Sequence, residues 1–122
     1  MELTQTQLQS YVDGARRRER ERTTLREQRR EQARELAKRA AAILKTDFGA
    51  EEVLLYGSAV HGAWFREDSD IDLAVSGIPA SAFWHAWAAI SALTADIEVN
   101  LIDLADVTAA LLQEIRMTGE AL

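Results

Sequence analysis

Residues 54–58 read Leu-Leu-Tyr-Gly-Ser, and after a short spacer residues 70–72 read Asp-Ile-Asp. The first stretch is an apolar run that breaks at a Gly-Ser pair, and the second opens another apolar run. Because alternate residues of a strand point to the same side, Asp70 and Asp72 are expected to project from one face. Two adjacent carboxylates repel each other unless a cation lies between them, and carboxylate oxygens suit Mg²⁺. The Gly-Ser turn offers backbone N–H groups to an anion. Together the two stretches indicate a site for a nucleotide and a metal ion.

The composition is typical of a globular protein with one domain. The chain has 122 residues, of which 48% are hydrophobic and 28% are charged, and this length allows a modest core. It contains no cysteine, which excludes a disulfide framework and thiol-ligated zinc. No secretory leader is visible, and the least polar window, residues 80–95, falls short of a membrane span of roughly 18 apolar residues. We therefore expect a soluble, cytoplasmic protein.

The charge is distributed unevenly along the chain. Residues 1–46 contain 12 Lys and Arg against 7 Asp and Glu, whereas residues 47–122 contain 2 against 13. The two parts therefore carry +5 and −11, which sum to the net charge of −6. Such asymmetry is typical of a partner-binding arm beside a core with another task. We expect residues 1–46 to form the arm and residues 47–122 the core.

Residues 4–45 are rich in strong helix formers and are predicted to form one long helix. Thr4 and Gln7 form a plausible capping box at its start, and Gly49 is the expected stop signal. Such a helix would be roughly 60 Å long, more than a core of this size can cover. Only its C-terminal part should pack on the core, through an apolar stripe of Ala33, Leu36, Ala37, Ala40, Ile43 and Leu44.

The outer part of this helix has little apolar surface. Leu25 is the single large apolar residue in residues 16–30, and a small patch of Leu3, Leu8, Tyr11 and Val12 lies further out. This part is therefore expected to be solvated or docked on another molecule, including a second copy of the chain. Its arginines also suit nucleic acid, but interleaved glutamates dilute the positive charge, which makes that alternative the weaker one.

After Gly49 the hydrophobic pattern changes to that of strands and short helices. Strands are predicted at residues 53–56, 71–75 and 97–102. A helix is predicted at residues 81–94, capped by Ser81, with core positions at Phe83, Trp84, Trp87, Ile90 and Leu93. A final helix is predicted at residues 106–117, ended by Gly119, with Val107, Leu111 and Ile115 on one face. The predicted fold class is α/β (α+β in some schemes), with a small mixed sheet, helices on one face and the site on the other.

The Gly-Ser pair and residues 68–73, Asp-Ser-Asp-Ile-Asp-Leu, resemble the signature of the polymerase-β-like nucleotidyltransferases. The short chain resembles the minimal nucleotidyltransferase group, whose members are antitoxin partners of HEPN-type toxins. The resemblance covers about residues 34–122. Without the Gly-Ser turn, two solvent-facing residues on an ordinary edge strand would be the favoured interpretation of the two aspartates.

The resemblance implies a role for each motif residue. Gly57 would let the backbone approach nucleotide phosphates, and Ser58 would donate its hydroxyl to them. Asp70 and Asp72 would bind Mg²⁺, which bridges the triphosphate and organises attack on the α-phosphate.

One position departs from the family pattern. A later strand normally supplies a third carboxylate within Val-Asp-Leu-Val/Ile, but residues 99–102 read Val-Asn-Leu-Ile. The amide of Asn100 is neutral and cannot accept a proton as a base. Glu98 lies two residues earlier on the same face, displaced by about 6.5 Å, and is the candidate substitute. The catalytic candidates are therefore Asp70, Asp72, Glu98 and Asn100.

The loop after the Gly-Ser pair also departs from the pattern. The minimal group often has Arg-x-Arg-Gly there, whereas residues 59–62 read Ala-Val-His-Gly. His61 and Arg66 remain as candidates for phosphate contact, although each also fits an ordinary loop residue. The spacer is one residue longer than usual and contains Trp64 and Phe65, an aromatic pair that would stack on a base or meet a partner if it is exposed.

The resemblance implies Mg²⁺-dependent transfer of AMP from ATP to a hydroxyl of a HEPN-type toxin. The alternative is a catalytically degenerate binding or assembly protein that acts by protein–protein contact, with self-association through the N-terminal helix. Transfer to a small molecule is the weaker idea, because antibiotic nucleotidyltransferases usually carry an additional helical domain.

Overall fold

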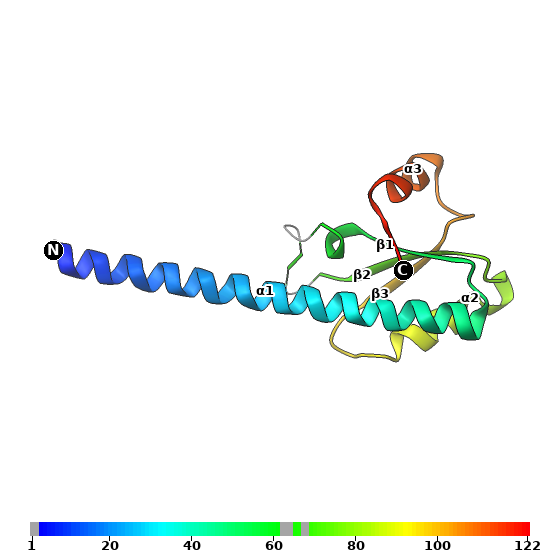
Figure 1. The fold of residues 1–122 in the computed structure, drawn as a ribbon, viewed down its shortest axis with the longest axis horizontal. Coiled ribbons are helices and arrows are strands. Elements are labelled where there is room, and N and C mark those ends of the chain that lie inside the picture. The colour runs from blue at the N-terminus through cyan, green and yellow to red at the C-terminus, as the bar shows by residue number, and fades with distance from the viewer. Residues whose placement is uncertain (1–2, 62–64, 67–68) are drawn as a thin grey trace.

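The computed structural model describes residues 3–61, 65–66 and 69–122. Figure 1 shows a long helix that extends from one side of an α/β body. The elements are α1 (Gln5–Phe48), β1 (Glu52–Tyr56), the 3₁₀ turn η1 (Gly57–Ala59), β2 (Ile71–Ser76), α2 (Ala80–Ser91), β3 (Val99–Asp103), α3 (Ala109–Thr118) and β4 (Glu120–Ala121). The predicted fold class is confirmed. Within the described ranges, no helix is both long and apolar enough to cross a membrane.

Among the residues that the structure describes, the sheet has four strands in the order β3-β2-β1-β4 and is mixed. β1 runs antiparallel to β2 and to β4, whereas β2 and β3 are parallel. The register pairs Tyr56 with Asp72 and Asp72 with Asn100, so these three residues form one row across β1, β2 and β3. The three strands predicted from the sequence are present as β1, β2 and β3, and β4 is an addition that the sequence did not indicate.

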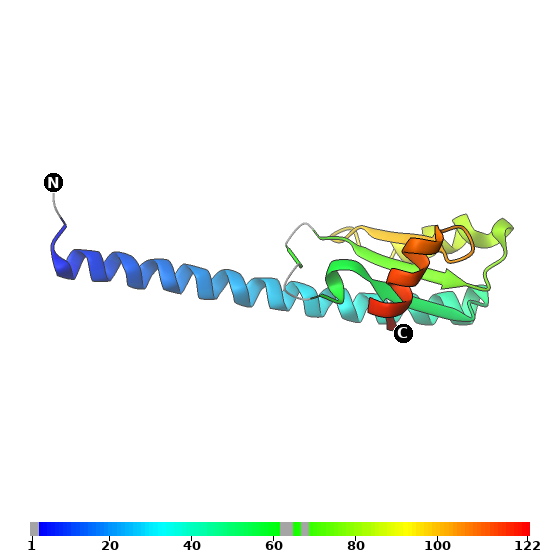
Figure 2. The same ribbon diagram turned by 90° about the horizontal axis from the view of Figure 1, so that it is seen from above.

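α1 spans 44 residues without a break. The predicted capping box at Thr4 and Gln7 is present, and Gly49 ends the helix with a φ of 73°, a left-handed conformation that suits glycine. The outer part of α1 projects away from the sheet (Figure 2), and Leu8, Tyr11 and Leu25 on it are more than half exposed. The prediction that this part is not covered by the chain's own core is confirmed.

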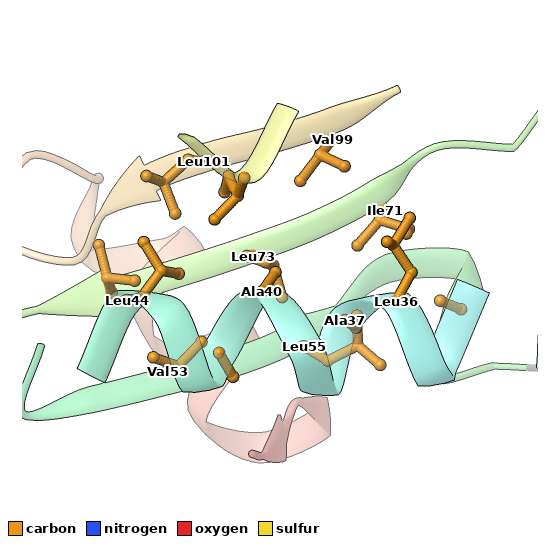
Figure 3. Packing of buried hydrophobic residues seen from close by; sticks show 14 of the residues in the cluster. Leu36, Ala37, Ala40, Leu44, Val53, Leu55, Ile71, Leu73, Val99 and Leu101 are labelled. Carbon is orange, nitrogen blue, oxygen red and sulfur yellow. The ribbon is translucent and has the colours of Figure 1, made fainter. Parts of the chain in front are cut away.

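The main core lies between the sheet and the pair α1 and α2 (Figure 3). The buried side chains of α1 are Ala33, Leu36, Ala37, Ala40, Ala41 and Leu44, which include most of the predicted stripe, and Ile43 packs at its edge. They meet alternate residues of the strands, among them Leu55, Ile71, Leu73 and Leu101. Small alanines let the helix lie close to the sheet, and burial of the larger side chains stabilises this arrangement by about 1.5–3 kcal/mol each.

α3 packs on the opposite face of the sheet and forms a second, smaller cluster. Ile115 of α3 contacts a group that includes Leu54 and Ala74. The expected placement of helices on one face therefore holds for α1 and α2, while α3 covers part of the face that carries Asp72. Gly119 ends α3, as predicted.

The structure corrects two details of α2. The helix begins at Ala80 with Pro79 as its N-cap, so Ser81 is not the cap. Trp84, expected in the core, is 71% exposed and stacks on Trp87 with ring centroids 5.4 Å apart. The core-facing stripe runs through residues 83, 86, 87 and 90, which places Trp84 on the flank of the helix.

The aromatic pair of the spacer is only partly described. Phe65 is 2% exposed and belongs to the main core, so it does not meet the condition, exposure, under which it would stack on a base or meet a partner. An apolar ring gains more from burial in the core than from a place in a loop. Trp64 lies outside the described residues.

Candidate functional site

The structure brings three of the predicted site residues together. Asp70 directly precedes β2, Asp72 lies on it, and Asn100 is the register partner of Asp72 on β3. The Asn100 amide nitrogen Nδ2 lies 3.4 Å from Asp70 Oδ2 and 3.4 Å from Asp72 Oδ1 and donates weakly to both. These three side chains lie on the sheet face opposite α1. They alternate along their strands with Ile71, Leu73 and Leu101, which are buried on the side of α1.

The negative charges of the carboxylates at the site are only partly offset by the hydrogen bond from Asn100. Partial burial raises the pKa of the Asp72 carboxyl above its usual 3.8, the Asn100 hydrogen bond lowers it, and the charges of Asp70 and Glu98 raise it further. The pKa of Tyr56 is raised by burial and by the charge of Asp72. A bound cation would remove the repulsion between the carboxylates.

The Gly57 turn lies directly against the Asp72 carboxylate. Gly57 has a φ of +77°, and a Cβ built there would lie 2.7 Å from Asp72 Oδ2. The Gly57 carbonyl accepts hydrogen bonds from the N–H groups of Val60 and His61, at 3.2 and 3.3 Å, which closes the turn. Ser58 follows within η1 and is half-buried. The turn and the aspartates therefore form one continuous site, and glycine is required at their contact.

An arginine from α1 holds the other end of this turn. Arg30 Nε donates to the Ala59 carbonyl oxygen at 3.0 Å, and its Nη2 donates to the Val60 carbonyl oxygen at 3.1 Å. The sequence analysis did not identify Arg30. No local signal distinguishes it from the other arginines of α1, because its partners lie about 30 residues further along the chain.

The remaining candidates lie around the site and make fewer contacts with it. His61 and Arg66 are exposed, and the Arg66 backbone N–H donates to Ser69 Oγ at 2.8 Å, just before Asp70. Glu98 is exposed and precedes β3, and its backbone carbonyl accepts from Ile71 N–H at 2.9 Å. Within residues 3–61, 65–66 and 69–122, no three His, Cys, Asp or Glu residues group closely enough to hold a metal ion.

The donor set nevertheless fits one divalent cation. Asp70 and Asp72 offer hard carboxylate oxygens, and the Asn100 amide, whose oxygen and nitrogen are interchangeable by rotation, offers a neutral one. The three side chains lie together and the pKa of Asp72 is raised, so a cation bound between them would stabilise the charged carboxylates.

Replacing Asp72 with asparagine is expected to raise the midpoint of thermal unfolding at pH 7 slightly, because solvent screens the charge of a half-buried carboxyl. The pKa of Asp72 is higher in the folded state, so ionisation of this carboxyl destabilises the fold as the pH rises through that pKa. The neutral variant lacks this effect. Its gain in stability should vanish below a pH of about 3.8, where Asp72 of the unmodified chain is protonated in the folded and the unfolded state alike. Circular dichroism melts at several pH values measure the difference, and a variant less stable at pH 7 would contradict the direction of the shift.

A family model matches the part of the chain that contains these residues. The model described as "Polymerase beta, Nucleotidyltransferase" matches residues 38–122. The match begins inside α1 and includes η1, both aspartates and Asn100. No match was found among curated protein sequences.

Several solved structures resemble this chain. A crystal structure of a MntA–HpeT toxin–antitoxin mutant has 25% identity and a TM-score of 0.57, with 70% of this chain and 69% of that chain covered. A crystal structure of a toxin–antitoxin with AMP-PNP has 26% identity and a TM-score of 0.55, with 68% and 69% covered. A complex of tri-AMPylated Shewanella oneidensis HEPN toxin with MNT antitoxin has 20% identity and a TM-score of 0.55, with 73% and 70% covered. At this last identity the likeness shows the fold alone.

Proposed function

This chain belongs to the polymerase β nucleotidyltransferase family, and we propose that it is an antitoxin that transfers AMP from ATP to a HEPN-type toxin. The observation that carries the proposal is the contact between the Gly57 turn and Asp72, which joins a phosphate-binding turn to a pair of metal-binding carboxylates. Support comes from the similar toxin–antitoxin structure with AMP-PNP, and the complex that contains an AMPylated toxin shares the fold.

Each candidate residue has a role in this proposal. Gly57 and Ser58 bind the nucleotide phosphates through backbone N–H groups and the Ser58 hydroxyl. Asp70 and Asp72 hold Mg²⁺, with the Asn100 amide oxygen as a third donor. The ion, when bound, neutralises phosphate charge and orients the α-phosphate. His61 and Arg66, exposed in the loop between the turn and β2, are the additional phosphate contacts that we propose.

The proposed reaction is a displacement at the α-phosphorus of ATP. A hydroxyl oxygen of the toxin forms a bond to this phosphorus, and the bond from the phosphorus to the oxygen shared with the β-phosphate breaks. Pyrophosphate leaves with the electron pair of that bond. Asn100 cannot accept the hydroxyl proton, so in this proposal the proton passes to Glu98, an exposed carboxylate beside the row.

Asn100 also favours a second candidate function. An amide lies where the family normally has a third carboxylate, and it donates hydrogen bonds to both aspartates. In this alternative the chain does not transfer AMP and acts as a binding or assembly protein. Residues 1–46 would then be an arm that docks on the toxin or on a second copy, and residues 47–122 the core that carries it.

Incubation with ATP labelled on the α-phosphate, MgCl₂ and the product of the neighbouring reading frame, as the candidate toxin, separates the two functions. We expect label on the toxin, and none when ATP is labelled on the γ-phosphate, because the γ-phosphate leaves with pyrophosphate. The Asp70→Ala/Asp72→Ala variant and addition of EDTA should each abolish labelling. An unlabelled toxin in an intact complex would refute transfer and support the binding function.

A further inference from the structure

We propose that Arg30 is a positioning residue of the nucleotide site, through which α1 fixes the turn that binds phosphate. The inference rests on the proposed nucleotide binding at Gly57 and Ser58, and it deepens that function by assigning a role to α1.

The contacts of Arg30 are directional. Its guanidinium is part-buried and donates from two nitrogens, Nε and Nη2, to two successive carbonyls, those of Ala59 and Val60, at 3.0 and 3.1 Å. A planar group that makes two bonds fixes orientation as well as position. Hydrogen bonds from a charged donor are also roughly twice as strong as neutral ones.

These carbonyls lie at the C-terminal end of η1, where carbonyl groups lack partners inside the turn and carry partial negative charge. The opposite end of η1 is Gly57, which lies against the Asp72 carboxylate. Because η1 has only three residues, fixing its carbonyl end also limits the orientation of the N–H groups to which the proposed function assigns the nucleotide phosphates. Arg30, the turn and Asp72 thus form one continuous series of contacts.

The segment of α1 that follows Arg30 is fixed by its packing in the core. Ala33, one turn further along α1, is 0% exposed, and Ala37 is also 0% exposed. The helix is therefore held in the core immediately beside the arginine. Arg30 precedes residues 38–122, the part that matches the family model, so the contact links the nucleotide turn to a segment that the match does not cover.

Nucleotide titration of the full-length chain tests the proposal. Isothermal titration calorimetry with AMP-PNP and Mg²⁺ should show that Arg30→Ala weakens binding about tenfold, the loss expected when one charge-assisted contact no longer orders the turn. Arg30→Lys, which keeps the charge but not the two-pronged geometry, should weaken binding about threefold.

Arg29 provides a matched control. It is the adjacent residue of α1, and its Nη2 donates to a backbone carbonyl outside the helix, that of Asp96, at 2.6 Å. Arg29→Ala therefore removes the same kind of contact from a segment away from the nucleotide turn, and its affinity for AMP-PNP should stay within about twofold of the unmodified chain. Equal losses in Arg29→Ala and Arg30→Ala would overturn the proposal, because they would show general destabilisation.

Amide hydrogen exchange gives a readout that does not depend on nucleotide. In Arg30→Ala, the Val60 and His61 amides, which bond the Gly57 carbonyl, should exchange at least about tenfold faster, while Arg29→Ala should leave them unchanged. If the unmodified chain binds no AMP-PNP, the proposed function fails and this role of Arg30 fails with it. If the chain binds but Arg30→Ala binds equally well, or its turn exchanges at the unmodified rate, only the positioning role is refuted.

Discussion

Replacing Asn100 with aspartate is expected to raise the rate of AMP transfer by at least about 100-fold, because an acid positioned inside the site is a better general base than Glu98, which is exposed and precedes β3. Asn100 is the register partner of Asp72, and its side chain already reaches Asp70 and Asp72 at 3.4 Å. A carboxylate there would add a proton acceptor and an anionic metal ligand without a change of backbone. Single-turnover rates with α-labelled ATP and saturating toxin measure the effect.

The matched control is Asn100→Ala, which removes the amide and adds no acid, and it should give no gain in rate. Asn100→Asp should also be less stable than the unmodified chain without Mg²⁺, because a third negative charge joins Asp70 and Asp72. Added Mg²⁺ should restore that stability. If Asn100→Asp transfers AMP no faster than the unmodified chain, Glu98 is already an efficient base, and Glu98→Gln should then abolish transfer.

Much of the fold follows from patterns that are local in the sequence. Buried strands appear as short apolar runs bounded by turn residues, and β1, β2 and β3 begin and end within two residues of the prediction. The ends of α1 are encoded in the capping box at Thr4 and in Gly49. β4 was not predictable, since two residues show no periodicity and it is defined by its pairing with β1.

Some contacts of the site also follow from local sequence patterns, whereas others depend on how distant parts of the chain pack together. The alternation of Asp70 and Asp72 predicts that they share a face, and the resemblance to the family implies that Asn100 lies beside them. The partnership of Arg30 with the turn depends on how α1 packs across the sheet, which no local pattern encodes. Trp84 shows the same limit, because helical spacing alone did not distinguish the flank of α2 from its core face.

Replacing Gly57 with alanine is expected to weaken AMP-PNP binding by at least about 100-fold and to destabilise the fold by about 1–3 kcal/mol. Two effects act together. A φ of +77° is strained for any residue with a Cβ, and this Cβ would lie 2.7 Å from Asp72 Oδ2, so either the turn or the carboxylate must move. Because the turn and Asp72 are both parts of the proposed nucleotide site, either movement disrupts it. Calorimetric titration measures the affinity, and urea unfolding measures the free energy.

Gly49 separates the two effects. Its φ of +73° is nearly the same, but a Cβ built there meets nothing within 4 Å. Gly49→Ala should therefore show only the cost of the left-handed conformation, about 1 kcal/mol, and should bind AMP-PNP as the unmodified chain does. The difference between the two variants isolates the contact of residue 57 with Asp72. If Gly57→Ala loses no more affinity than Gly49→Ala, that contact has no part in nucleotide binding, and the observation on which the proposed function rests is removed.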